Sequence, residues 1–167
     1  MELKARVYKT EIKWALIFSL MFLTWTAMEK AAGLHNVRLD LQPFIGPLIL
    51  LPSIIIYLLA LLDKKSRYFM GTMSYRQGFA SGCLLTIFIV ILSPLNNLLA
   101  ALFITPEYFA NVTEYTVSMG VLTPEAAARQ FSISNYIVTS VVAGLITGII
   151  FSAVISIFTK TRSYNHE

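Results

Sequence analysis

The sequence predicts an all-α, polytopic integral membrane protein with four transmembrane helices and a short amphipathic helix between the third and fourth. Three observations predict this fold class. The 167 residues are 56% hydrophobic and 13% charged, with a mean hydropathy of +0.68, which lies outside the range of ordinary soluble domains. Four apolar runs have about the 20 residues that a helix needs to cross a bilayer. Basic residues flank these runs. We therefore expect a single membrane domain over residues 1–167, folded as a four-helix bundle in a lipid bilayer.

The four predicted spans are residues 13–30, 43–62, 79–104 and 136–158. The first is the shortest apolar run, but Trp14 and Trp25 bracket it as interfacial anchors, and its helix can continue through Glu29 and Lys30. Its basic prelude is similar to a signal peptide, yet the stretch TAMEKAAG offers no clear cleavage site. We therefore expect this segment to be retained as a span.

The basic residues predict the orientation of the spans. Ten of the thirteen Lys and Arg residues lie before or at the start of the first span, between the second and third, or after the fourth. Because loops rich in Lys and Arg stay in the cytoplasm, both termini and the loop 63–78 should be cytoplasmic. The loop 105–135 should lie outside, since it carries three glutamates and a single arginine.

Two similar stretches in this outer loop predict helix starts, TPEY at Thr105 and TPEA at Thr123. Each offers a Thr N-cap, a Pro at the first helical position and an acid near the positive end of the helix dipole. The first helix should run to about Met119 and stop at Gly120. We expect it to lie along the outer membrane surface or to cap the bundle, because its apolar residues recur at helical spacing: Tyr108, Val112, Tyr115 and Met119. The second helix should merge into the fourth span.

The third span carries an unusual stretch, ILSPLNNLLAALF, from Ile91 to Phe103. Pro94 removes one backbone hydrogen bond and should kink the helix, and Pro52 should do the same in the second span. Asn96 and Asn97 are about 100° apart around a helix, so they cannot both face one neighbour. An unpaired amide in hydrocarbon is costly, so both should point into protein or water.

These amides have two readings. In the preferred one they hydrogen-bond across helices and hold the spans together. In the other they line a polar cavity in the outer half of the membrane, whose candidate residues are Glu29, Lys30, Asn96, Asn97, Glu107 and Tyr108. For Glu29 and Lys30 a solvated pair at the helix end is favoured, and His35 is expected to be a loop residue in water.

The fourth span contains a stripe of small residues, Ser140, Gly144, Gly148, Ser152 and Ser156. Small residues at every fourth position form a groove in which a second helix can approach closely. We expect a helix of the same chain there, with a homodimer or another membrane protein as the alternative partner.

Several kinds of chemistry have no support in the sequence. One cysteine, Cys83, and two histidines, His35 and His166, supply neither a disulfide nor a closed zinc site. The net charge of +4 lies beside apolar runs instead of on one polar face, so no nucleic-acid partner is expected. Catalytic motifs such as GxSxG and HExxH are missing from the sequence. We expect no metal and no cofactor, and a non-enzymatic protein is favoured over an enzyme.

The order of features resembles one known family. GLH after the first span, SYRQGFASG before the third, TPEYF and TPEAAARQ in the outer loop, and the Gly/Ser-rich last span are similar to the domain of unknown function 4199 family. Its members are small four-span bacterial membrane proteins. The resemblance implies an inner-membrane location, but no activity and no functional residues.

Three function classes remain open. The leading one is a non-enzymatic accessory or interaction protein, which fits the small-residue stripe, the helix expected to cap the bundle and the lack of catalytic motifs. The alternative is a small-solute transporter or channel, which with four spans would act as an oligomer. A membrane-embedded enzyme is the least favoured, because Glu29, Glu107 and His35 have no evident orienting partner.

Overall fold

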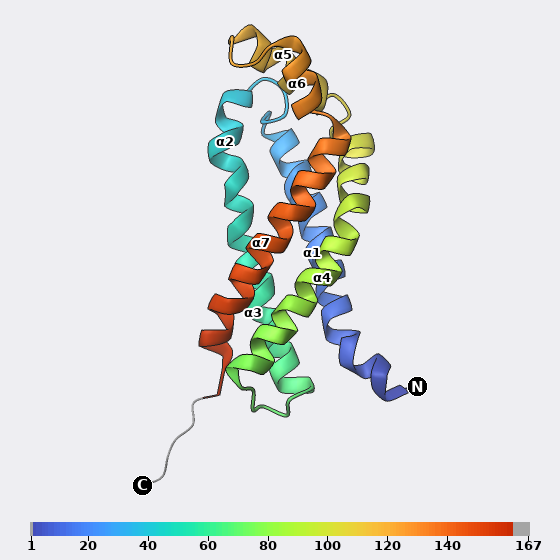
Figure 1. Cartoon of the computed structure of the whole chain (residues 1–167), viewed down its shortest axis with the longest axis vertical. Coiled ribbons are helices and arrows are strands. Elements are labelled where there is room, and N and C mark those ends of the chain that lie inside the picture. Colours follow the sequence, from blue (N-terminus) through green and yellow to red (C-terminus); the bar gives the residue numbers. More distant parts are fainter. Residues whose placement is uncertain (1, 162–167) are drawn as a thin grey trace. The chain divides into compact units, whose positions relative to one another are not determined.

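The computed structural model describes residues 2–161, with side chains from residue 8 onward (Figure 1). Every element in this part of the chain is helical, as predicted. The elements are α1 (Glu2–Ala31), η1 (Leu39–Leu41), α2 (Gln42–Ile45), η2 (Gly46–Ile49), α3 (Leu50–Arg67), α4 (Tyr75–Leu99), η3 (Ala100–Ile104), α5 (Tyr108–Ser118), α6 (Pro124–Gln130) and α7 (Ile133–Thr159).

Four helical stretches are long and apolar enough to cross a membrane: Tyr8–Ala31, Leu39–Arg67, Tyr75–Ile104 and Ile133–Thr159. They contain the four predicted spans and extend most of them by a few residues. Large apolar side chains on these stretches are exposed, among them Leu20 (68%), Ile91 (66%) and Phe158 (78%). Exposed apolar surface of this extent requires an apolar solvent, which a bilayer supplies. The chain is a multi-pass membrane protein.

The chain folds into two compact units. The first comprises the described parts of Met1–Phe18, Leu51–Ile91 and Gly144–Glu167. The second comprises Ser19–Leu50 and Leu92–Ala143.

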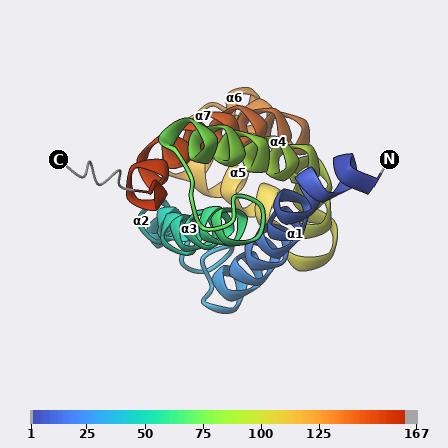
Figure 2. The same cartoon turned by 90° about the horizontal axis from the view of Figure 1, so that it is seen from below.

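In the first unit α4 packs closely on α7, and the two helices lie side by side in both views (Figures 1 and 2). Small residues on both helices make this approach possible. A Cβ on Gly82 would lie 2.6 Å from Oγ of Ser152, and one on Gly78 would lie 3.0 Å from Oγ of Ser156. The contacts continue along α7, where Gly148 faces Thr86 and Gly144 faces Val90. The predicted small-residue stripe is thus covered here by a helix of the same chain.

A hydrogen-bonded pair lies within this packing. The hydroxyls of Tyr57 and Thr86 are 2.9 Å apart, and Thr86 also donates to the carbonyl of Gly82 at 3.0 Å. Both side chains are almost fully buried. The hydroxyls of both residues are therefore hydrogen-bonded within the first unit, as is usual for buried polar groups.

The first unit also contains a buried ion pair between α1 and α3. Nζ of Lys64 lies 2.8 Å from Oε1 and 3.1 Å from Oε2 of Glu11. Each residue is only 3% exposed. Nζ also lies 4.3 Å from the centre of the Tyr68 ring. Lys64 is one of the four basic residues in the segment 63–78. Its charge is neutralised within the protein by Glu11.

Other charges at the same end of α3 are also bound within the unit. Lys13 and Arg67 form ion pairs with Asp63, and Nε1 of Trp14 donates to it at 2.8 Å. Lys65 donates to the carbonyl of Thr159 at 2.9 Å. These contacts tie α1 and α7 to the end of α3.

The start of the second span is irregular. α2 and η2 each carry a proline near their start, Pro43 and Pro47, and the chain reaches regular α-helical geometry only at α3. Pro52 lies in the first turn of α3, where a missing N–H leaves few hydrogen bonds unmade. The irregular backbone therefore lies before Pro52. In the third span, α4 continues through Pro94 without ending.

The outer loop begins differently from the prediction. α5 starts at Tyr108, and the hydroxyl of Thr105 donates to the carbonyl of Ala100 at 3.3 Å instead of capping the helix. The third span ends in a π-helical turn, η3, whose last bond runs from N–H of Thr105 to the same carbonyl at 2.7 Å. Thr105 therefore closes the preceding helix. The predicted stop is confirmed, since Met119 caps α5 and Gly120 has a φ of +68°.

The second helix start is confirmed, but its predicted merger with the fourth span is wrong. The hydroxyl of Thr123 accepts from N–H of Ala126, and α6 ends at Gln130. Ser132 then accepts from N–H of Asn135 at 3.3 Å and so begins a new helix, α7. The side chain of Asn135 donates to the carbonyl of Gln130 at 2.8 Å. These two polar side chains satisfy both helix ends and stabilise the break.

Candidate functional site

The second unit contains a cavity of about 160 Å³. Its walls come from α1, α2, η2, the end of α4, η3, α5 and the first turn of α7, together with the loops that follow α1 and η3. Six polar side chains line it, namely Thr26, Glu29, His35, Gln42, Asn97 and Thr105. Five Phe, Tyr and Trp side chains do so as well, namely Phe22, Trp25, Tyr108, Phe109 and Tyr136. A cavity of this size with polar walls holds several waters or a small polar molecule.

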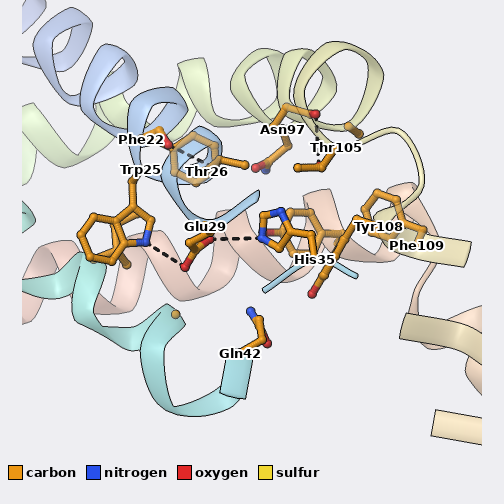
Figure 3. Close-up of a pocket in the computed structure, with 15 residues that line it drawn as sticks. Phe22, Trp25, Thr26, Glu29, His35, Gln42, Asn97, Thr105, Tyr108 and Phe109 are labelled. Carbon is orange, nitrogen blue, oxygen red and sulfur yellow. Dashed lines mark hydrogen bonds and ion pairs between the residues drawn. The ribbon is translucent and has the colours of Figure 1, made fainter. Parts of the chain in front are cut away.

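Three polar side chains in contact with one another lie on one wall (Figure 3). Nε1 of Trp25 donates to Oε1 of Glu29 at 2.8 Å, one helical turn away on α1. Oε2 of Glu29 lies 3.3 Å from Nε2 of His35. The carboxylate is held from two sides, and its side chain is 12% exposed. Gln42 reaches toward the same group from α2.

His35 is buried, with 8% exposure, so the expectation of a loop histidine in water is wrong. Its ring packs 4.9 Å from the ring of Tyr108 on α5, and its carbonyl accepts from Nδ2 of Asn111 at 3.0 Å. Its neighbour Leu34 is 2% exposed and anchors the loop. Contacts with α5, which lies over 70 residues further along the chain, bury this histidine.

The two asparagines have different partners, as their angular separation predicts. Nδ2 of Asn96 donates to the hydroxyl of Ser19 on α1 at 2.9 Å. Nδ2 of Asn97 donates to the hydroxyls of Ser140 on α7 at 2.6 Å and of Ser93 at 3.3 Å. Both residues are nearly buried, but only Asn97 lines the cavity. Asn97 therefore links two helices and also contributes to the cavity wall.

The candidate cavity residues divide into two groups. Glu29, Asn97 and Tyr108 line the cavity. Lys30 and Glu107 are exposed and do not line it, and Asn96 faces α1 instead. Glu29 and Lys30 are thus not a solvated pair, because Glu29 turns toward His35 while Lys30 faces outward.

Tyr108 contributes a phenol to the wall. Burial raises the pKa of Tyr108 to about 12, and the nearby Tyr136 and Glu29 add to this shift. The upward direction means that the neutral phenol is favoured over the phenolate. At neutral pH Tyr108 therefore keeps its proton as a hydrogen-bond donor, and Glu29 is the acidic side chain of the cavity wall.

Sequence reasoning missed several lining residues, namely Trp25, His35, Gln42, Thr105 and Tyr136. One signal was present in the sequence. Trp25 and Glu29 are four residues apart on one helix, so their side chains are neighbours. The other residues come from separate segments, and no local pattern joins them.

Comparison with known proteins gives one match. The model of a family described as "Protein of unknown function (DUF4199)" matches residues 13–161. No curated protein matches the chain, and no solved structure does.

Proposed function

Because the chain belongs to the DUF4199 family of proteins of unknown function, its activity has to be argued from its own residues, and we propose that it binds a small polar solute. The binding site is the cavity of the second unit. By the orientation argued from the basic residues, the cavity lies toward the non-cytoplasmic side of the membrane.

One observation carries this proposal. Nδ1 of His35 is buried and has no hydrogen-bond partner among the described residues, although His35 lines the cavity. Buried polar atoms are almost always hydrogen-bonded, so an atom of this kind beside a polar cavity indicates a bound partner. Glu29, fixed by Trp25, adds a preorganised charge to the same wall.

A protein that binds or transports a solute is thus favoured over an accessory protein. The small-residue stripe was one of the features that favoured an accessory role, but α4 of the same chain occupies the part that lies in the first unit, as expected. The cavity, in contrast, has polar and aromatic walls that suit a small solute. Transport would require the same binding step, so a carrier is a special case of the proposed function.

Thermal unfolding of the purified protein tests the proposal. A ligand that binds only the folded state raises the unfolding temperature with its concentration. Four small probes of equal heavy-atom count cover the main chemical classes: ethanolammonium, acetate, acetamide and ethylene glycol. We expect at least one of them to give a saturable increase. No increase with any probe would contradict the proposal.

Two variants make the test specific for the cavity. Ala101 lines the cavity, so Ala101→Leu should fill part of it and abolish the response. Ala143 is exposed on α7 and does not line the cavity, so Ala143→Leu should respond like the wild type. Equal responses of both variants would place the binding elsewhere.

The two asparagines should separate stability from binding. Asn96→Leu and Asn97→Leu should each lower the free energy of unfolding by about 1 kcal/mol, because each removes interhelical hydrogen bonds. Only Asn97→Leu should also weaken the response to the probe, since Asn96 does not line the cavity. Chemical unfolding and probe titration of both variants measure the two effects. If Asn96→Leu weakened binding as much as Asn97→Leu, the assignment of Asn97 to the site would be wrong.

A further inference from the structure

The chemistry of the cavity wall indicates which class of solute it accepts, and this inference rests on the proposed binding function. His35 sets the first requirement. Its Nε2 lies 3.3 Å from the Glu29 carboxylate, and a carboxylate only accepts hydrogen bonds. In the neutral imidazole the proton is therefore on Nε2, and Nδ1 carries a lone pair. The unpartnered atom is an acceptor, so its ligand must donate a hydrogen bond.

Asn97 adds a second acceptor. Its amide nitrogen is used by the hydroxyls of Ser93 and Ser140. The carbonyl oxygen is then the part of this side chain left for a ligand. The hydroxyl of Thr105 donates to the carbonyl of Ala100, so its proton is also used within the protein. His35 and Asn97 thus each offer an acceptor to a ligand that donates hydrogen bonds.

The charge of the cavity wall indicates whether a ligand that donates hydrogen bonds is a cation, an anion or a neutral molecule. Glu29 is the acidic residue of the wall, and none of the fifteen lining residues is Lys or Arg. Counting histidine as neutral, as in the net charge of the chain, the wall has one formal negative charge. A wall of this charge attracts a cation and repels a carboxylate or phosphate.

The aromatic residues favour an organic cation. The faces of Trp, Tyr and Phe rings attract cations, and this attraction is stronger when the cation is removed from water. Trp25 lies beside Glu29 on α1, and Tyr108 lies against His35 (Figure 3). The ring centres of Phe109 and Tyr136 are 5.6 Å apart. Aromatic walls around one carboxylate suit a small alkylammonium better than a strongly hydrated metal ion.

We propose that the cavity binds a small protonated amine, whose ammonium group donates to Nδ1 of His35 and whose positive charge is attracted by Glu29 on the other side of the imidazole ring. The ammonium can come from a free amine or from the headgroup of a lipid such as phosphatidylethanolamine. Both sources offer the same donors and the same charge.

The probe panel on the wild-type protein tests this inference directly. Ethanolammonium should bind on the order of tenfold more tightly than acetate, acetamide or ethylene glycol. Tight binding of another probe instead would overturn the amine class and leave the proposed function standing. No binding of any probe would overturn both. Tetramethylammonium carries the charge without an N–H donor, so equal affinity for it would exclude the bond to His35.

Glu29→Gln tests the role of the carboxylate. The amide oxygen can still accept from Trp25, but the charge is lost, so the affinity for ethanolammonium should fall by about tenfold or more. Unchanged affinity would overturn the role of Glu29. The emission of Trp25 in a Trp14→Phe background gives a second readout, since the chain has two tryptophans. If the variant does not fold, the wild-type panel still decides.

The source of the ammonium is tested in nanodiscs. If it is a lipid headgroup, phosphatidylethanolamine should stabilise the protein and compete with ethanolammonium, whereas phosphatidylglycerol should not. If it is a free amine, ethanolammonium should bind equally well in both lipids. Both results support the ammonium class, and failure of ethanolammonium and phosphatidylethanolamine alike would contradict it.

Discussion

Lys64→Met is expected to lower the free energy of unfolding by about 3–5 kcal/mol, because it leaves the buried carboxylate of Glu11 without its partner. Both residues are 3% exposed, so water does not replace the lost contact. The double variant Glu11→Leu with Lys64→Met removes both charges and should recover most of the loss, since a buried ion pair replaced by apolar residues is often neutral in stability. Chemical unfolding in detergent micelles measures all three proteins.

Lys9 provides a matched control. It lies on the same helix as Glu11 but is exposed, so Lys9→Met changes the net charge equally and should have little effect. Similar losses for Lys9→Met and Lys64→Met, or no recovery in the double variant, would show that Lys64 does not stabilise the fold through Glu11.

Among the variants proposed here, Gly82→Ala is expected to lower the free energy of unfolding most after Lys64→Met. The new Cβ would lie 2.6 Å from Oγ and 3.0 Å from Cα of Ser152, and backbone atoms cannot move aside like a side chain. Overpacking of this kind costs about 1–3 kcal/mol, while Ala gains up to about 1 kcal/mol over Gly in a helix. We therefore expect a net loss of up to about 2 kcal/mol.

Gly144→Ala on α7 should behave in the opposite way. Its Cβ would meet only Cγ2 of Val90, at an ordinary 3.4 Å. The gain in helix propensity should then leave the protein equally stable or slightly more stable. Both variants are compared by unfolding in the same detergent. If Gly82→Ala were as stable as Gly144→Ala, the close contact of α4 with α7 would be wrong.

The sequence was sufficient for the spans, because a run of about 20 apolar residues is a direct consequence of bilayer thickness. It was less reliable at helix ends. Thr105 and Thr123 stand in the same local pattern, yet only Thr123 caps a helix. The difference comes from the preceding residues. The π-helical turn before Thr105 engages both its N–H and its hydroxyl, whereas no span precedes Thr123.

The site was harder to predict than the fold. From the sequence, Glu29, Asn97 and Tyr108 were expected at a similar depth in the outer half of the membrane. All three line the cavity. His35 was misjudged because a polar loop after a span is usually exposed. Its burial depends on α5, which supplies Tyr108 and Asn111 from a distant part of the chain. Contacts of such long sequence separation leave no local periodicity.

Cysteine labelling from one side of the membrane tests most directly whether the chain crosses the bilayer as the proposed site requires. In a Cys83→Ser background, Val121→Cys marks the loop between α5 and α6, and Met70→Cys marks the loop between α3 and α4. Both positions are well exposed, at 68% and 85%. An impermeant maleimide added outside intact cells should label position 121 and should reach position 70 only after permeabilisation. Labelling of both positions from outside would contradict the four-span arrangement, and labelling of position 70 alone would contradict the outward-facing cavity.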